Sequence, residues 1–125
     1  MLQRDCPCGS GTPYDACCGA LHRGTRLAAT PLQLMRARYA AYAVGDADFV
    51  FTSWHPRTRP ASVTLDDDLV WTSLEIHGDG LLDERNGWVE FTARYLARTG
   101  AGRLHERSRF ERRAGRWLYL DGDIG

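Results

Sequence analysis

Four cysteines crowded near the start of the chain are the feature that most constrains this sequence. They are Cys6, Cys8, Cys17 and Cys18, and no other thiol follows them. A tetrahedral zinc site needs four soft ligands about 2.3 Å from the metal, and two short ligand pairs joined by a tight loop supply them with little chain. The glycines and prolines between the pairs suit such a loop. We therefore expect the four thiolates to bind one zinc ion (Zn²⁺), which folds the segment on binding.

Two other uses of these cysteines stay open. Disulfides are disfavoured by the adjacency of Cys17 and Cys18 and by a reducing compartment. A redox role lacks the usual C-x-x-C spacing. His22 is a spare ligand candidate, but with four thiols at hand we expect it to be a surface histidine.

The string from Cys6 to Gly19 resembles the SEC-C motif found at the C-terminal tail of the SecA translocation ATPase. The spacing of the cysteines, the Gly-Ser-Gly sequence and Tyr14 all agree. The resemblance implies a zinc-dependent module over residues 1–24 that contacts a protein partner. It implies zinc and does not imply an enzyme.

The charge balance bears on the class of partner. The 16 basic residues, all of them arginine, equal the 16 acidic residues in number. The chain therefore lacks the broad positive field on which sequence-independent nucleic-acid binding relies. Nucleic acid is a disfavoured partner that stays open. Codon bias explains the absence of lysine as well as a phosphate-binding preference does.

Hydropathy and length point to one core and no membrane segment. A chain of 125 residues that is 43% hydrophobic is long enough to bury one core. No apolar run resembles a signal peptide or reaches the length of a bilayer-spanning helix. We therefore expect a cytoplasmic protein with no membrane partner.

Helix signals follow the cysteine segment. Thr30 as N-cap, Pro31 at the first helical position and Gln33 as part of a capping box mark a helix start. Apolar residues then recur at spacings of three and four. They are Leu32, Met35, Tyr39 and Tyr42. Gly45 is placed to end this helix and Asp46 to begin a second one.

The second half of the chain has the pattern of four antiparallel strands separated by glycine-containing turns. The strands are expected at 71–77, 88–96, 104–112 and 117–121. The first turn is expected at 78–80. The acidic run at 66–68 matches no metal-binding loop, so we interpret it as a solvated turn. Helices followed by such a sheet predict an α+β fold with helices packed on one sheet face.

This order of elements resembles the nuclear-transport-factor-2-like (NTF2-like) superfamily, whose curved sheet wraps the helices into a cone. Five segments are similar to the YchJ family of uncharacterised bacterial proteins, which carry the same cysteine string: 35–42, 54–60, 89–95, 104–110 and 115–122. The resemblance implies a fold and a metal but no established reaction. Some members have a second cysteine cluster at the C-terminus, and this chain lacks it.

The resemblance also implies two parts, a zinc segment at 1–24 and an NTF2-like domain at 25–125. We expect the zinc segment to contribute little to the apolar stripe of the first helix or to the strand faces. A chain starting near Thr25 should then keep its sheet.

The last predicted hairpin suggests a pocket. A two-residue turn would place Phe110 opposite Tyr119 and Ser108 opposite Asp121. If the aromatic pair points into the core, Ser108, Asp121 and Glu106 lie near the mouth of the cone as a candidate acid/base site. Further candidate residues for this pocket are Tyr39, Trp54, His55 and Arg94. A buried hydrogen-bonded network that fixes the sheet to the helices is the simpler interpretation.

Two functions are compatible with these patterns. The first is a noncatalytic interaction protein, in which the zinc segment contacts a partner and the NTF2-like domain is a scaffold that can form a homodimer through its sheet. The alternative is a small-molecule-binding enzyme of the isomerase, hydratase or hydrolase type that works from the cone. A filled cone in the structure would favour the first, and an open cavity with a charged pair would favour the second.

Overall fold

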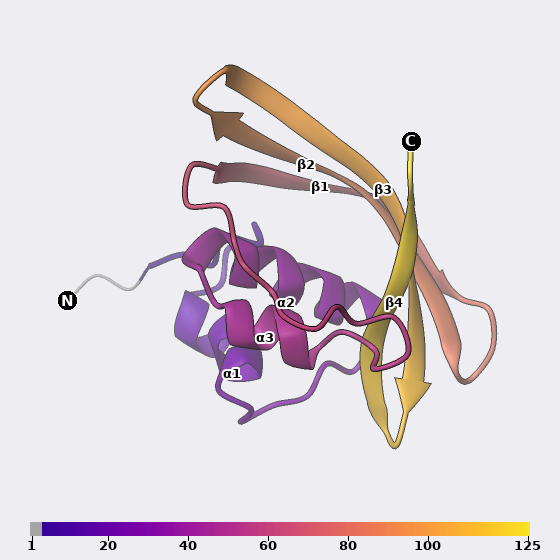
Figure 1. Cartoon of the computed structure of the whole chain (residues 1–125). Coiled ribbons are helices and arrows are strands. Elements are labelled where there is room, and N and C mark those ends of the chain that lie inside the picture. The colour runs from indigo at the N-terminus through magenta and orange to yellow at the C-terminus, as the bar shows by residue number, and fades with distance from the viewer. Residues whose placement is uncertain (1–3) are drawn as a thin grey trace.

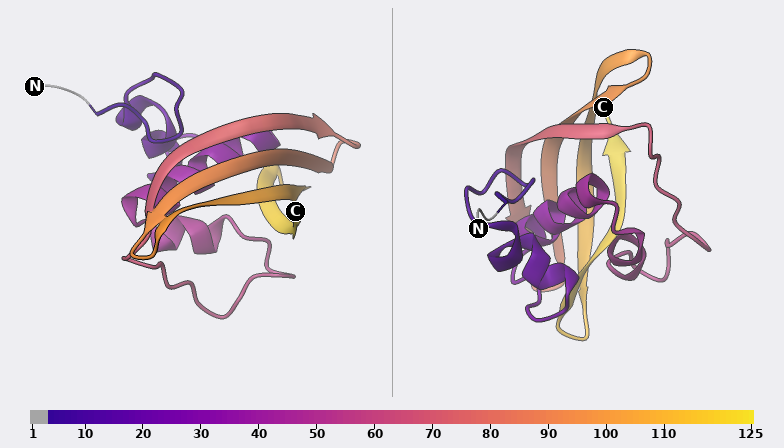
Figure 2. Two further views of the ribbon diagram at one scale, coloured as in Figure 1. Left: turned by 90° about the horizontal axis from the view of Figure 1, so that it is seen from above. Right: turned by 90° about the vertical axis from the view of Figure 1, so that its left-hand side faces the viewer.

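A curved antiparallel sheet covers one side of the long helix α2 in the computed structural model, which describes residues 4–125 (Figures 1 and 2). The elements are η1 (Tyr14–Ala16), α1 (Cys18–His22), α2 (Pro31–Val44), α3 (Ala47–Thr52), β1 (Val70–Leu81), β2 (Asn86–Ala97), β3 (Gly100–Arg113) and β4 (Arg116–Ile124). The sheet order is β1-β2-β3-β4, with each strand antiparallel to its neighbours. The predicted α+β fold is confirmed. No helix among the described residues is long and apolar enough to cross a membrane.

The boundaries of α2 and α3 follow from local capping. The hydroxyl of Thr30 accepts a hydrogen bond from the N–H of Gln33 at 3.1 Å. Gly45 ends α2 at φ 83°, in the left-handed region where a residue without a Cβ is favoured. Asp46 then caps α3 by accepting from the N–H of Phe49 at 3.0 Å. The predicted helix start and junction are confirmed.

Helix α2 is buried on two faces. Its first buried face packs on the sheet in the main core, which is formed by Leu34, Met35, Tyr39, Val89, Phe91, Ala93, Phe110 and Trp117. On the second face, Ala37 and Ala40 are fully buried against the cysteine segment. Arg36 adds a hydrogen bond of 2.8 Å to the carbonyl oxygen of Cys8. Small side chains on α2 let the cysteine segment approach closely, on a face of the helix outside the predicted apolar stripe. The independence of the two parts stays a prediction.

The first hairpin differs from the sequence prediction. Strand β1 runs through residues 78–80, where a turn was expected, and the chain reverses after Leu81. Gly78 and Gly80 lie against the indole of Trp88, and a Cβ on Gly80 would come within 2.9 Å of its Nε1. These glycines thus make room for a ring on the neighbouring strand and do not form a turn.

The last hairpin pairs Phe110 with Tyr119, as predicted. Beyond that pair the register is irregular, and β4 contains one extra residue. Ser108 therefore lies opposite Gly122, and the predicted pairing of Ser108 with Asp121 is wrong. One bulge is enough to exchange the faces on which the following residues lie.

The segment after α3 adds to the free edge of β4. The N–H of His55 donates to the carbonyl oxygen of Tyr119 at 2.7 Å. The N–H of Tyr119 donates in turn to the carbonyl oxygen of Ser53 at 2.8 Å. This short parallel pairing fixes Trp54 beside β4.

Candidate functional site

A cavity of about 270 Å³ lies between α2 and the sheet. Most of its wall is aromatic or aliphatic, from Met35, Tyr39, Tyr42, Trp54, Trp71, Phe91, Ala93, Leu104 and Tyr119. Arg38, Glu106 and Ser108 contribute the polar part of the lining. Of the residues predicted for a pocket, the structure brings Tyr39, Trp54, Glu106 and Ser108 together here.

Glu106 is the carboxylate of this cavity. Its Oε2 accepts a short hydrogen bond from the hydroxyl of Ser108 and another from the hydroxyl of Tyr119 at 3.2 Å. Burial, reinforced by the negative charge of Glu106, raises the pKa of Tyr119, so its hydroxyl keeps its proton. Gly122 lies against the Glu106 carboxyl group, and a Cβ at that position would collide with it. The extra residue in β4 thus places a glycine where the carboxylate needs space.

Arg38 supplies the cation. Only 5% of its surface is exposed, and its Nη1 donates to the carbonyl oxygen of Val50 at 3.0 Å and to the hydroxyl of Ser53 at 2.7 Å. Burial lowers the pKa of Arg38, and nearby groups that include Glu106 oppose that shift. An arginine remains protonated even so. The two charges do not form an ion pair, since no carboxylate of residues 4–125 lies within 4.0 Å of the guanidinium nitrogens.

Trp54 leaves a buried donor without a partner. Its Nε1 is buried and forms no hydrogen bond within the described part of the chain. The ring packs edge-on against Tyr119, with centroids 5.2 Å apart, and the Arg38 guanidinium carbon lies 5.1 Å from the Trp54 ring centroid. A buried unsatisfied donor costs about 1–3 kcal/mol. The Trp54 ring thus lines the cavity, while its indole N–H stays unpaired in the protein interior.

Two of the predicted pocket residues lie elsewhere. Arg94 pairs with Glu75 at 3.1 Å, and 47% of its side chain is exposed. It alternates with the inward-facing Ala93 along β2 and so points to the opposite sheet face. Asp121 accepts from Nε of Arg109 at 2.6 Å, again away from the cavity, because the extra residue in β4 turns it outward.

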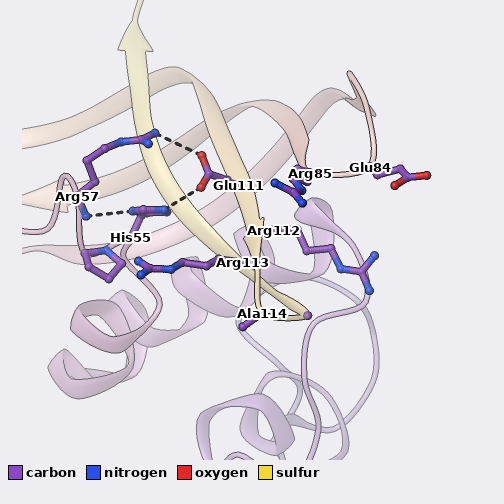
Figure 3. A pocket seen from close by; sticks show the side chains of 10 residues that line it. His55, Arg57, Glu84, Arg85, Glu111, Arg112, Arg113 and Ala114 are labelled. Carbon is purple, nitrogen blue, oxygen red and sulfur yellow. Dashed lines mark hydrogen bonds and ion pairs between the residues drawn. The ribbon is translucent and has the colours of Figure 1, made fainter.

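His55 lines a separate, open groove of about 920 Å³ (Figure 3). Its Nδ1 accepts from the N–H of Arg57 at 3.0 Å, which leaves the proton on Nε2 to donate to Glu111 at 3.0 Å. This hydrogen bond, with further help from Arg57, holds the pKa of Glu111 below its usual range. The groove is rich in arginine: Arg57, Arg85, Arg112 and Arg113.

Sequence reasoning missed Arg38, although a signal was present. Arg38 comes three residues after Met35 and four before Tyr42, so helical spacing alone places it beside the apolar stripe. Charged residues are seldom assigned to a core position, because a fully buried charge is rare. The missed residue is the cation of the cavity.

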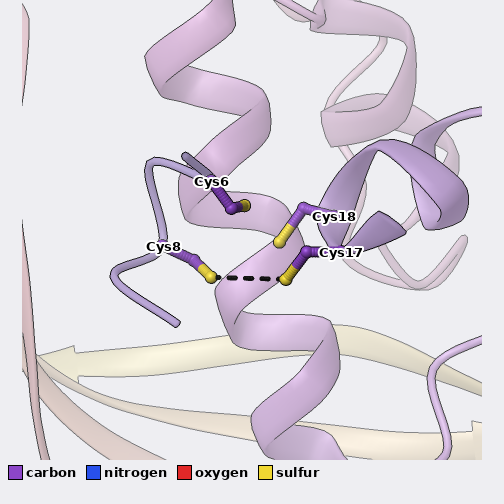
Figure 4. Close-up of side chains that lie close together, drawn as sticks. All are labelled: Cys6, Cys8, Cys17 and Cys18. Atoms are coloured by element: carbon purple, nitrogen blue, oxygen red, sulfur yellow. Dashed lines mark hydrogen bonds between the residues drawn. The ribbon is translucent and has the colours of Figure 1, made fainter. Parts of the chain in front are cut away.

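The cysteines form two facing pairs (Figure 4). Cys6 and Cys8 lie on the first loop, and Cys17 and Cys18 lie at the start of α1. All four Sγ atoms lie within 4.8 Å of one another, and no disulfide joins them. The Sγ atoms of Cys8 and Cys17 are 3.7 Å apart. Four sulfurs at about 2.3 Å from a tetrahedral zinc ion would be about 3.8 Å apart. The cluster can therefore hold a metal ion, and the Cys8–Cys17 separation matches that expected around zinc.

Proton sharing within the cluster is uneven. A hydrogen bond from Cys18 lowers the pKa of Cys8 to about 4. The same hydrogen bond, together with burial, raises the pKa of Cys18, and burial raises that of Cys6. The protein by itself thus favours the thiolate at Cys8, and a bound cation would favour the thiolates of Cys6 and Cys18 as well.

His22 is a structural link and not the surface residue that was expected. Only 4% of its side chain is exposed. Its Nδ1 lies 2.6 Å from the hydroxyl of Tyr14, and its Nε2 lies 2.8 Å from the carbonyl oxygen of Ala37 on α2. The ring connects the cysteine segment to α2 and is not one of the four clustered ligands.

Comparison with known families agrees with this architecture. Residues 5–20 match the SEC-C motif, and residues 30–122 match the YchJ middle NTF2-like domain. The chain belongs to the YchJ family. The resemblance drawn from sequence and the predicted NTF2-like fold are both confirmed. The division at residues 24 and 25 stays a prediction.

Other YchJ-family proteins match along nearly the whole chain. A UPF0225 protein of Streptomyces coelicolor is 49% identical over 95% of this chain and 94% of its own length. A UPF0225 protein of Deinococcus radiodurans is 51% identical over 94% of this chain and 88% of its own length.

Two solved structures share the arrangement of segment and domain. A SEC-C motif containing protein from Rhodopseudomonas palustris superimposes with a TM-score of 0.85 at 36% identity, covering 98% of this chain and 99% of its own. A SEC-C motif containing protein from Psychrobacter arcticus gives a TM-score of 0.79 at 25% identity. This superposition covers 98% of the present chain and 83% of the Psychrobacter chain. The relation therefore covers the cysteine segment as well as the sheet.

Proposed function

We propose that this protein is a zinc-stabilised small-molecule-binding protein. The ligand occupies the cavity between α2 and the sheet, and the zinc ion holds the cysteine segment on the other buried face of α2. The cavity is the observation that carries the proposal, because it combines aromatic walls with two separate charges, the buried Arg38 and the half-buried Glu106.

Unused hydrogen-bonding groups favour a binding site over a purely structural network. Buried polar groups in folded proteins nearly always have partners. The indole N–H of Trp54 has none, and Arg38 donates only through Nη1 within residues 4–125. A network that served only stability would be expected to satisfy the Trp54 donor. Glu106 could also act as a base on a bound substrate, which would extend binding to the isomerase or hydratase class.

The zinc ion has a structural role in this proposal. Four thiolates complete a tetrahedral zinc site and leave no coordination position for a substrate. Elemental analysis of protein purified without chelator should find one zinc ion per chain. Protein without zinc, with its four cysteines joined as disulfides, would refute this part of the proposal.

A thermal-shift screen of metabolites tests the cavity, with Glu106→Gln as the diagnostic variant. The parent protein should be stabilised by at least one compound, and Glu106→Gln should lose that stabilisation while melting near the parent temperature. Glu90→Gln is the matched control, because Glu90 pairs with His105 at 3.0 Å outside the cavity. A network without a ligand would instead make Glu106→Gln less stable by about 1–3 kcal/mol. That result, with no compound binding the parent, would refute small-molecule binding.

The arginine-rich groove supports a second candidate function, contact with an acidic segment of a partner protein. Arg85, Arg112 and Arg113 line it and form no ion pair within the described residues, while Arg57 pairs with Glu111. A synthetic poly-glutamate peptide should bind the parent at low salt and weaken as salt screens the charges. Loss of binding in Arg85→Ala and Arg113→Ala, but not in Arg94→Ala on the sheet, would support this candidate. Equal binding by all four proteins would refute it.

A further inference from the structure

We infer that the cavity binds a small zwitterion, namely a free amino acid with an aromatic or large aliphatic side chain. The inference rests on the proposed small-molecule site and specifies the chemistry of its ligand. Three features of the cavity lead to it: an unpaired cation, a carboxylate with a free oxygen, and aromatic walls.

The cation favours a carboxylate on the ligand. Arg38 is 5% exposed, lines the cavity, and uses only Nη1 for hydrogen bonds to described residues. Its Nε and Nη2 remain as donors, and a planar guanidinium binds a carboxylate through two such donors. The unpartnered Nε1 of Trp54 belongs to a ring beside the same guanidinium. A ligand carboxylate here would accept from Nε and Nη2 of Arg38, which donate to none of the described residues.

The carboxylate favours an ammonium group on the ligand. Glu106 accepts from Ser108 and Tyr119 through Oε2, and its Oε1 accepts no hydrogen bond from the described residues. An ammonium group donates up to three hydrogen bonds and would donate one of them to Oε1 of Glu106. The aromatic rings of the wall can also attract such a cation.

Charge neutrality selects a ligand that carries both groups. A ligand with only a carboxylate would pair with Arg38 but bring a second negative charge near Glu106. A ligand with only an amine would leave Arg38 buried without a counter-ion. Unpaired buried charges are costly, so a ligand with one positive and one negative group fits the cavity best.

Size and wall chemistry select the rest of the ligand. The cavity of about 270 Å³ would hold roughly nine waters at about 30 Å³ each. This volume suits a single amino acid. The ring of Trp71 packs edge-on with those of Tyr39 and Tyr42 at 6.2 Å, which forms an aromatic wall. Such a wall favours an aromatic or large aliphatic side chain.

Calorimetry of the zinc-loaded full chain tests the ligand class. The probes are L-phenylalanine, L-tyrosine, L-tryptophan and L-leucine, each compared with its analogue lacking the amine and its analogue lacking the carboxylate. At least one amino acid should bind, and both of its singly charged analogues should bind at least tenfold more weakly. Equal binding by either analogue would overturn the inference, since one of the two charges would then have no role.

Variants assign the binding to the cavity. Glu106→Gln should weaken binding of the amino acid at least tenfold but should not weaken binding of the amine-free analogue, which no longer meets a second negative charge. Gly122→Ala should act in the same way, because its added Cβ would displace the Glu106 carboxyl group without changing any charge. Glu90→Gln, outside the cavity, should bind like the parent. An amino acid that binds all of these proteins equally would overturn the inference.

A neutral fragment library, screened by ligand-observed NMR with competition at the cavity, separates the two proposals. If neutral fragments bind in the cavity and no amino acid does, the zwitterion inference fails and small-molecule binding stands. If neither fragments nor amino acids bind, both proposals fail.

Discussion

His22 donates a hydrogen bond to Ala37, from its Nε2 to the carbonyl oxygen 2.8 Å away in the middle of α2. A carbonyl oxygen only accepts, so in the neutral ring the proton is on Nε2 and Nδ1 accepts from the hydroxyl of Tyr14. The cysteine segment is thus joined to α2 by a buried polar contact in addition to its apolar packing.

Replacing His22 tests this link. His22→Ala should lower the free energy of unfolding by about 2 kcal/mol, because it leaves a buried gap and removes two hydrogen bonds. His22→Gln keeps an amide that can donate to Ala37 and should lose less. Urea unfolding of the zinc-loaded proteins measures both values. A His22→Ala protein as stable as the parent would show that the link is dispensable.

Removal of the cysteine segment should weaken the rest of the protein. A chain that starts at Thr25 exposes the face of α2 that carries Ala37 and Ala40 and loses the contacts of Leu21. Burying one such leucine contributes about 1.5–3 kcal/mol. We expect the shortened chain to lose at least about 2 kcal/mol in urea unfolding. Unchanged stability would favour the independence that was expected from sequence.

Gly19→Ala should disturb the cysteine segment from within. A Cβ at this position would lie 2.7 Å from the carbonyl oxygen of Tyr14 and 2.9 Å from a carbon of its ring. Main chain cannot move aside cheaply, so the free energy of unfolding should fall by about 1–3 kcal/mol. Gly125→Ala is the control, since its Cβ would come no closer than 3.9 Å to another residue. Equal unfolding midpoints for both variants would contradict the predicted clash.

The contact between His55 and Glu111 should make stability depend on pH. The hydrogen bond from His55 holds the pKa of Glu111 below its ordinary value of 4.5. A carboxyl group whose pKa is lowered by folding stabilises the protein at pH values above its ordinary pKa. That stabilisation is lost as the pH falls through the lowered pKa. Near pH 7, Glu111→Gln should be less stable than the parent by about 0.5–1 kcal/mol, since the pair is partly solvated. Arg57 also contacts Glu111 and adds to the same trend.

Urea unfolding of both proteins at a series of pH values measures this difference. The gap between parent and Glu111→Gln should be largest near neutrality and should shrink as pH falls below 4.5. A gap that is constant or that widens in acid would contradict the assignment of the carboxylate as the hydrogen-bond acceptor.

Local chemistry determined much of this protein. The spacing of the four cysteines defined the cluster, because two short ligand pairs joined by a short loop are held close enough to surround one ion. Thr30 and Gly45 defined the limits of α2, because capping depends on residues within one turn. The pattern of strands and turns likewise predicted four antiparallel strands and the pairing of Phe110 with Tyr119.

The cavity depended on relations between distant segments, which only the tertiary structure decided. One extra residue in β4 turned Asp121 outward and placed Gly122 beside Glu106, and no local pattern announces a bulge of this kind. Helix α3, the residues that follow it and β4 cover Arg38, which is how this residue becomes buried on a helix whose ends the sequence defined correctly. Sequence determined the ligand cluster and the caps, because each depends on neighbours along the chain. Packing between segments far apart in the chain decided which charges face one another across the cavity.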